Sequence, residues 1–205
     1  MSRIPNTLSR RGVITGLAAA IACPALASPA RRSAEALVAA ARRQVGVTLA
    51  YDPDYSKIGF PNGDVQRSRG VCTDVVIRAY RDAFGLDLQA LVNADMRRAF
   101  GEYPHLWGLR APDPSIDHRR VPNLRTFLAR QGARLPIPAA EDGWQPGDIF
   151  TSLIDRRLPH IGFVSDLRPD GRPGCIIHNI GAGAHEEVAL FDYPVTGRYR
   201  WALDA

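Results

Sequence analysis

Hydrophobic residues in the first half of the chain recur at the spacing of amphipathic helices. Ser33 precedes apolar residues at positions 37, 38, 41 and 45, and serine is a preferred residue at the N-cap of a helix. Gly46, Gly85 and Gly132 follow such runs and indicate where helices end. The pattern predicts helices at residues 33–46, 72–84, 87–100 and 122–132.

The second half of the chain changes to short apolar and β-branched runs, separated by turn signals such as Pro169-Asp170-Gly171. Helices followed by a run of strands are typical of an α+β fold in which the helices pack on one face of the sheet. Residues 47–71 are rich in proline and glycine and predict a long structured loop, a type of segment that often carries function. The predicted strands form an antiparallel meander at residues 148–153, 161–167, 175–180, 188–190 and 197–203.

The first 27 residues have the pattern of a secretory signal peptide. Arg10 and Arg11 precede a run of small apolar residues that is too short to span a bilayer, and Ala25-Leu26-Ala27 resembles a processing site. The adjacent arginines also fit a twin-arginine export signal. We therefore expect residues 1–27 to be removed and residues 28–205 to fold as a single domain in the periplasm.

Composition and charge limit the partners of the chain. It has 205 residues, of which 45% are hydrophobic and 23% are charged, as in ordinary globular proteins that bury a core without metals or disulfides. The formal net charge of +5 includes three arginines of the leader, and no basic stripe with interleaved aromatic residues follows. We therefore expect no nucleic-acid partner and no membrane span, while the sequence leaves the oligomeric state open.

Three cysteines leave several possibilities open. Cys23 lies in the leader, where lipid modification is the alternative to simple cleavage. In an oxidising compartment Cys72 and Cys175 can form one disulfide. Cys72 also lies at the predicted N-terminus of a helix, where the helix dipole and unpaired N–H groups lower the pKa of a thiol. That position makes Cys72 a candidate nucleophile.

Two histidines on predicted strands complete a candidate catalytic site. His160 begins one strand and His178 lies in the next, so antiparallel pairing brings both imidazoles to one face. A thiol at a helix N-terminus, a base on a strand and an orienting residue on the neighbouring strand are what nucleophilic acyl transfer requires. Cys72, His160 and His178 are together candidates for this arrangement, while the alternative is that each is a buried structural residue.

The order of these motifs resembles that of the NlpC/p60 cysteine peptidases. The resemblance implies a papain-like α+β fold with Cys72 as nucleophile, His160 as general base and His178 as the orienting residue. It also implies a place for Tyr51 at the site and cleavage of peptide bonds in peptidoglycan. Thr73-Asp74 stands where those peptidases generally carry Ser-Gly. The motifs are Gly70-Val71-Cys72-Thr73-Asp74-Val75-Val76, Gly147-Asp148-Ile149-Phe150, His160-Ile161-Gly162-Phe163-Val164 and Ile177-His178-Asn179.

Longer motifs resemble a family of exported bacterial proteins catalogued as domain of unknown function 1287 (DUF1287). This resemblance spans nearly all of the chain after the leader. The motifs are Tyr51-Asp52, Tyr55, Pro61-Asn62-Gly63-Asp64, Gly70-Val71-Cys72-Thr73-Asp74-Val75-Val76-Ile77-Arg78 and Ile116-Asp117-His118-Arg119-Arg120-Val121-Pro122-Asn123-Leu124.

The segment Asp117-His118-Arg119-Arg120 is a second concentration of polar residues. A pair of guanidinium groups can hold a carboxylate in a bidentate grip, which suits the terminus of a cell-wall peptide. The alternative is that the segment only ties its loop to the following helix. Asp64 and Asp74 are further candidates for contact with substrate.

Three functions are compatible with these residues. The first is a periplasmic cysteine hydrolase that needs no cofactor or metal and cleaves an amide or peptide bond in peptidoglycan peptides. The second is a non-hydrolytic relative, either a thiol acyltransferase or a cell-wall-binding module. The third is a metal site built from Cys72, His160, His178 and Asp166, which no HExxH or CxxC motif supports.

We expect the exported protein to begin near Ser28, because the leader is short and apolar and ends at Ala25-Leu26-Ala27. N-terminal sequencing of periplasmic material measures this start. An intact Met1 or an acylated Cys23 would contradict a soluble periplasmic protein.

Overall fold

The structure is a computed structural model that describes Met1 and residues 32–204. Apart from Met1, the predicted leader lies outside the described residues. Residues 32–204 belong to one compact unit. Its elements are the helices α1 (Ala34–Arg42), α2 (Cys72–Phe84), α3 (Leu88–Ala99) and α4 (Val121–Arg130), and the strands β1 (Ala50–Tyr51), β2 (Arg69–Gly70), β3 (Arg134–Leu135), β4 (Ile149–Ile154), β5 (Leu158–Val164), β6 (Cys175–Asn179), β7 (Ala184–Val188) and β8 (Val195–Tyr199).

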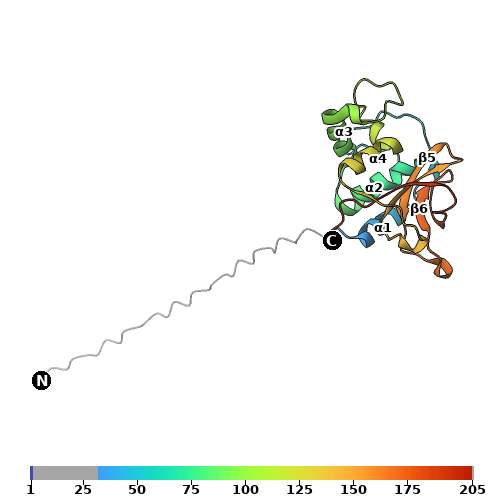
Figure 1. The fold of residues 1–205 in the computed structure, drawn as a ribbon. Coiled ribbons are helices and arrows are strands. Elements are labelled where there is room, and N and C mark those ends of the chain that lie inside the picture. The colour runs from blue at the N-terminus through green and yellow to red at the C-terminus, as the bar shows by residue number, and fades with distance from the viewer. Residues whose placement is uncertain (2–31, 205) are drawn as a thin grey trace. The chain divides into compact units, whose positions relative to one another are not determined.

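An antiparallel sheet of six strands, in the order β3-β8-β4-β5-β6-β7, forms one layer. Helices α1 to α4 lie to one side of strands β5 and β6 in Figure 1. The larger hydrophobic core joins buried side chains of these helices with Ile149, Ile161 and Ile177 of the sheet. The chain thus has the α+β architecture that its pattern of apolar residues predicts.

The predicted helices agree with the structure except at their ends. The Ser33 hydroxyl accepts a hydrogen bond from the backbone N–H of Ala36 and caps α1. Gly85 ends α2 with a φ of 65°, a left-handed conformation that glycine adopts readily. Helix α1 stops at Arg42, earlier than predicted, and turns occupy the residues that follow it.

The strand predictions agree with the structure for β4, β5 and β6 and differ from it for the other strands. Strands β4, β5 and β6 occupy predicted segments, and β4 to β7 form the expected meander. Strand β8, however, returns to pair with β4. The strand predicted at residues 188–190 is instead β7, which ends at Val188. The short strands β1, β2 and β3 were not predicted, because backbone pairing rather than an apolar pattern defines them.

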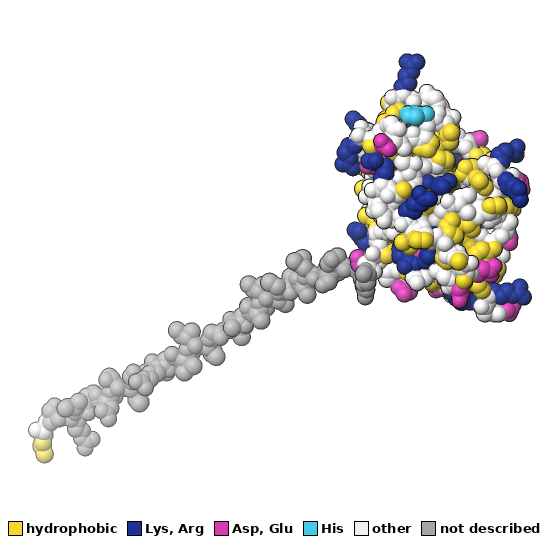
Figure 2. Space-filling view, viewed as in Figure 1, with side chains coloured by type: hydrophobic (Ala, Val, Ile, Leu, Met, Phe, Trp, Pro, Cys, Tyr) yellow, Lys and Arg dark blue, Asp and Glu magenta, His cyan; other side chains and the backbone are white. Residues whose placement is uncertain are grey.

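On the face shown in Figure 2, lysine and arginine side chains are dispersed among hydrophobic and uncharged atoms. Within residues 32–204, none of the helices combines the length and the apolar character that a membrane crossing needs.

Gly162 allows β5 to approach β6 closely beside the two predicted site histidines. A Cβ atom at this position would lie 2.7 Å from the carbonyl oxygen of Ile177, 2.8 Å from the ring of Phe150 and 2.9 Å from the Cβ of His178. These distances are too short for an added methyl group, so the spacing of the two strands depends on glycine.

We expect Gly162→Ala to destabilise the protein by about 1–3 kcal/mol, because the added methyl group overpacks a closed site. Urea unfolding measures the change. Gly101→Ala is the matched control, since a Cβ there meets nothing within 4 Å, and it should stay within about 0.5 kcal/mol of wild type. Equal unfolding midpoints for the two variants would contradict this reading of Gly162.

Candidate active site

Asp74, the third residue of helix α2, caps the N-terminus of that helix. The backbone N–H of Val71 donates to Oδ2 of Asp74 at 2.7 Å, which satisfies a donor that the helix leaves unpaired. Just before it, Gly70 pairs with Tyr51 in the parallel β1–β2 ladder. These contacts fix Cys72, the first residue of α2, beside the strand that carries Tyr51.

The Cys72 thiol lies between helix α2 and strand β5. Cys72 and Pro159 line the same cleft, which has a volume of about 500 Å³. The backbone N–H of Ile161 hydrogen-bonds to the sulfur. His160 lies between Pro159 and Ile161 in β5, so the backbone of the predicted base passes beside the nucleophile candidate.

His160 and His178 are brought together by the pairing of β5 with β6. Nε2 of His160 lies 2.9 Å from Nδ1 of His178, so the two rings share a hydrogen bond. Nε2 of His178 lies 2.9 Å from Oε1 of Glu187 on β7. The result is a continuous chain of hydrogen bonds, His160–His178–Glu187, across three neighbouring strands.

Glu187 is the member of this chain that sequence reasoning missed. The strand predicted at residues 188–190 does not include Glu187, whereas the residue belongs to β7. His185, Glu186 and Glu187 are three consecutive polar residues, so no alternation of apolar and polar positions indicated a strand there.

Burial determines the charge of the reacting groups. Burial, reinforced by the negative charge of Asp74, raises the pKa of the Cys72 thiol to about 12. Burial, together with the neighbouring His178, lowers the pKa of His160 to about 3. Burial also lowers the pKa of His178. At neutral pH the thiol and both imidazoles are therefore uncharged.

This finding corrects the expectation that the helix N-terminus lowers the pKa of the Cys72 thiol. The backbone N–H groups of Cys72 and Thr73 do act in that direction. Cys72 is only 4% exposed, however, and removing a thiolate from water outweighs the partial charges of the helix end.

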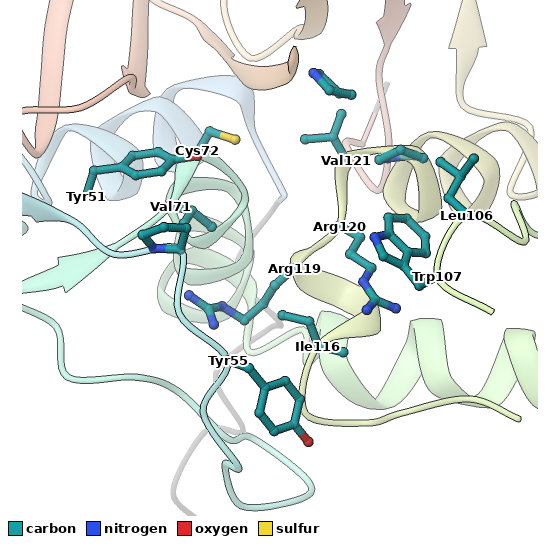
Figure 3. A pocket seen from close by; sticks show the side chains of 13 residues that line it. Tyr51, Tyr55, Val71, Cys72, Leu106, Trp107, Ile116, Arg119, Arg120 and Val121 are labelled. Carbon is teal, nitrogen blue, oxygen red and sulfur yellow. The ribbon is translucent and has the colours of Figure 1, made fainter. Parts of the chain in front are cut away.

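Tyr51 points its hydroxyl group toward the Cys72 sulfur (Figure 3). Burial, followed by the contact with Cys72, raises the pKa of Tyr51 to about 12. The phenol therefore keeps its proton at neutral pH and remains a hydrogen-bond donor beside the sulfur.

The cleft wall is mostly apolar and aromatic, with two arginines. Arg119 forms a buried bidentate pair with Asp74, with Nε–Oδ1 and Nη2–Oδ2 distances of 2.9 Å. Arg120 donates to Asp117 at 2.9 Å and places its guanidinium 3.9 Å from the centre of the Trp107 ring. Both cations thus already have a carboxylate partner. The other lining residues besides Cys72 are Tyr51, Pro53, Tyr55, Val71, Leu106, Trp107, Ile116, Val121, Pro122 and Pro159.

Of the residues predicted to bind substrate, Tyr51, Arg119 and Arg120 line the cleft. Asp74 lies behind it, where it holds Arg119 and the start of α2. Asp117 accepts from Arg120 and, at 2.6 Å, from the backbone N–H of Asp113.

The remaining two predicted substrate-binding residues lie away from the cleft wall. Asp64 is bonded to the buried guanidinium of Arg78 at 2.9 Å. His118 is buried, and burial lowers its pKa to about 4. In the described residues, both side chains therefore belong to the framework around the site.

Cys72 and Cys175 are both free thiols, so the disulfide alternative is not formed. Asp166 is paired with Arg42. Within the described part of the chain, no group of three or more His, Cys, Asp or Glu side chains is arranged to hold a metal ion.

Comparison with known proteins identifies relatives of this chain. The family model described as "Domain of unknown function (DUF1287)" matches residues 38–201. A protein of Escherichia coli (strain K12), named uncharacterized protein YijF, is 50% identical over 167 residues, covering 81% of this chain and 80% of that protein. The solved structure of NlpC1 from Trichomonas vaginalis is similar over 85% of this chain, with 15% identity and a TM-score of 0.42. The chain spans 46% of the length of that structure.

Cys72 should react with iodoacetamide faster than Cys175, because both residues are buried but Cys72 lines the cleft and Cys175 does not. The pKa of Cys72 is raised to about 12, so the thiolate fraction grows as the pH rises. The alkylation rate should therefore increase about tenfold per pH unit from about pH 7 to about pH 10.

Peptide mapping by mass spectrometry after timed alkylation measures both thiols in one sample. If the alkylation rate of Cys72 does not rise with pH near neutrality, the thiol is already ionised there. That result would contradict an uncharged Cys72 thiol at neutral pH. A quantitative Cys72–Cys175 disulfide in a non-reducing map would contradict Cys72 as a nucleophile.

Proposed function

The chain belongs to the DUF1287 family, and we propose that it is a periplasmic cysteine hydrolase with a papain-like fold that cleaves an amide or peptide bond in peptidoglycan peptides. The observation that carries the proposal is the Cys72 thiol beside β5, where His160 begins the His160–His178–Glu187 hydrogen-bond chain. The cell-wall substrate rests on the motifs shared with the NlpC/p60 peptidases. The periplasmic location rests on the pattern of the leader.

In the first step the Cys72 sulfur attacks the carbonyl carbon of the substrate. Because Nε2 of His160 is bonded to His178, Nδ1 is the ring nitrogen left to take the thiol proton. The thiol and the imidazole are both neutral before attack. Proton transfer to His160 therefore accompanies formation of the sulfur–carbon bond instead of preceding it.

Two donors near the sulfur are suited to the oxyanion that forms in this step. The first is the backbone N–H of Cys72 at the start of α2, and the second is the protonated hydroxyl of Tyr51. Donors that are fixed before the reaction stabilise the developing negative charge, and losing one typically costs about 10²–10³ in rate.

The second half of the reaction regenerates the thiol. The imidazolium of His160 gives its proton to the leaving nitrogen as the carbon–nitrogen bond breaks, which leaves a thioester on Cys72. Water then attacks the thioester while His160 accepts one water proton, and that proton returns to the Cys72 sulfur as the acid product departs.

One observation favours an acyltransferase as the second candidate function. The cleft wall beside Cys72 is formed mainly by apolar and aromatic side chains. Such a wall limits the water that reaches a thioester and gives an amine or alcohol acceptor the advantage. The products distinguish the two functions, because hydrolysis adds one water to the substrate and transfer adds the acceptor.

Cys72→Ala and His160→Ala should each lower the single-turnover rate by about 10²–10⁴ or more, and the double variant should be no slower than the slower single variant. The reason is that a nucleophile and its base act as one unit. The measurement is incubation of the mature protein with purified peptidoglycan fragments, followed by mass spectrometry of the products.

His105→Ala is the matched control, because this exposed histidine packs on Phe100 and does not line the cleft with Cys72. It should keep the wild-type rate. Folding of every variant is checked by circular dichroism. Full turnover by a folded His160→Ala protein would contradict the catalytic assignment.

A further inference from the structure

Glu186 and Glu187 are neighbours on strand β7, but their side chains serve different faces of the sheet. In the β6–β7 ladder Glu187 lies opposite Ile176 and His185 lies opposite His178. Residues on one face of an antiparallel pair also meet diagonally, which brings the carboxylate of Glu187 to 2.9 Å from Nε2 of His178. Glu186 points to the other face and binds Arg42. Because side chains alternate along the strand, the carboxylate of Glu187 contacts His178 and that of Glu186 contacts Arg42.

An ionised carboxylate can only accept hydrogen bonds, and this determines where the protons of both rings lie. His178 must carry its proton on Nε2 in order to donate to Glu187. In a neutral ring Nδ1 of His178 is then an acceptor, so Nε2 of His160 must carry a proton in order to donate to it at 2.9 Å. Nδ1 of His160 is then unprotonated and available to accept a proton.

Without a carboxylate at this end, the chain can run in the opposite direction. His178 would carry its proton on Nδ1 and donate to Nε2 of His160, and His160 would carry its own proton on Nδ1. A ring in that state presents N–H to the thiol and cannot accept the thiol proton. The same two hydrogen-bonded atoms thus allow an active and an inactive arrangement of protons.

We propose that Glu187 is a positioning residue that selects the Nε2–H tautomer of His178 and, through it, the Nε2–H tautomer of His160. The catalytic importance of this selection rests on the proposed function, because only a general base needs a free lone pair on Nδ1. Glu187 itself touches neither the thiol nor the cleft wall in the described residues, and it acts through two imidazoles.

Several other titratable groups lie near His178, and one of them supplies a negative charge like that of Glu187. His178 is faced by His160 on β5, by His185 and Glu187 on β7, and by the charge of Asp192 in the turn that follows. Asp192 is exposed and supplies a negative charge, while Glu187 supplies the hydrogen bond to Nε2 as well. Asp192→Asn is therefore a matched control for the loss of one negative charge.

The test combines imidazole ¹⁵N NMR of the protein without substrate with steady-state kinetics on one peptidoglycan fragment. Wild type should show Nε2–H tautomers for His160 and His178. In Glu187→Ala the Nδ1–H tautomers should become populated, and kcat should fall about tenfold with little change in KM, since a charge-assisted hydrogen bond shifts an equilibrium by about this factor.

Two further variants show whether the hydrogen bond of Glu187 or its negative charge selects the tautomers of the two histidines. Glu187→Gln offers an amide oxygen as acceptor, so it should recover most of the tautomer preference and of kcat that Glu187→Ala loses. Asp192→Asn should leave both tautomers as in wild type. Circular dichroism confirms that each variant is folded.

The possible outcomes separate this inference from the proposed function. Unchanged Nε2–H tautomers in folded Glu187→Ala would overturn the inference, whatever the activity. A tautomer shift of the same size in Asp192→Asn would also overturn it, because charge alone would then suffice. A shift in Glu187→Ala alone, in a protein whose wild type cleaves no fragment, would support the positioning role and contradict the hydrolase.

Discussion

The carboxylate of Asp74 connects the parts of this molecule on which the candidate chemistry depends. It accepts the backbone N–H of Val71, which fixes the first turn of α2, and it pairs with Arg119 in the cleft wall. Asp74 and Arg119 are both nearly inaccessible to water. Removing one partner of such a pair leaves an uncompensated buried charge, which costs about 3–5 kcal/mol. Position 74 thus ties the helix that carries Cys72 to the opposite wall.

The same carboxylate contributes to the neutral state of the nucleophile. Cys72 is buried and lies two residues from a negative charge, so its pKa is raised, while burial lowers the pKa of His160. An ion pair of thiolate and imidazolium is therefore not the resting state. In the proposed enzyme, reactivity would then depend on the orientation of a neutral base and on donors fixed in advance, so Tyr51 and the His160–His178–Glu187 chain would act together.

The sequence predicted those features that side-chain patterns control, and it missed those that backbone pairing controls. The apolar face of α2 and the glycine after it define that helix, and strand alternation places His160 and His178 on one face. Strand β7 lies at the edge of the sheet and presents polar residues, so hydrophobicity carries no signal for it. Glu187 was missed for that reason. The depressed thiol pKa was wrong because the sequence does not report how deeply Cys72 is buried.

The segment from Asp117 to Arg120 shows why a cluster of charges is a poor guide to substrate recognition. Its arginines fit a grip on a substrate carboxylate, yet Arg119 is held by Asp74 and Arg120 by Asp117. Arg120 also stacks on Trp107, with its guanidinium carbon 3.9 Å from the centre of the ring. A guanidinium that is already neutralised adds little attraction for a second anion. In the proposed enzyme, selectivity would then depend on how an uncharged part of the substrate fits the aromatic and apolar wall.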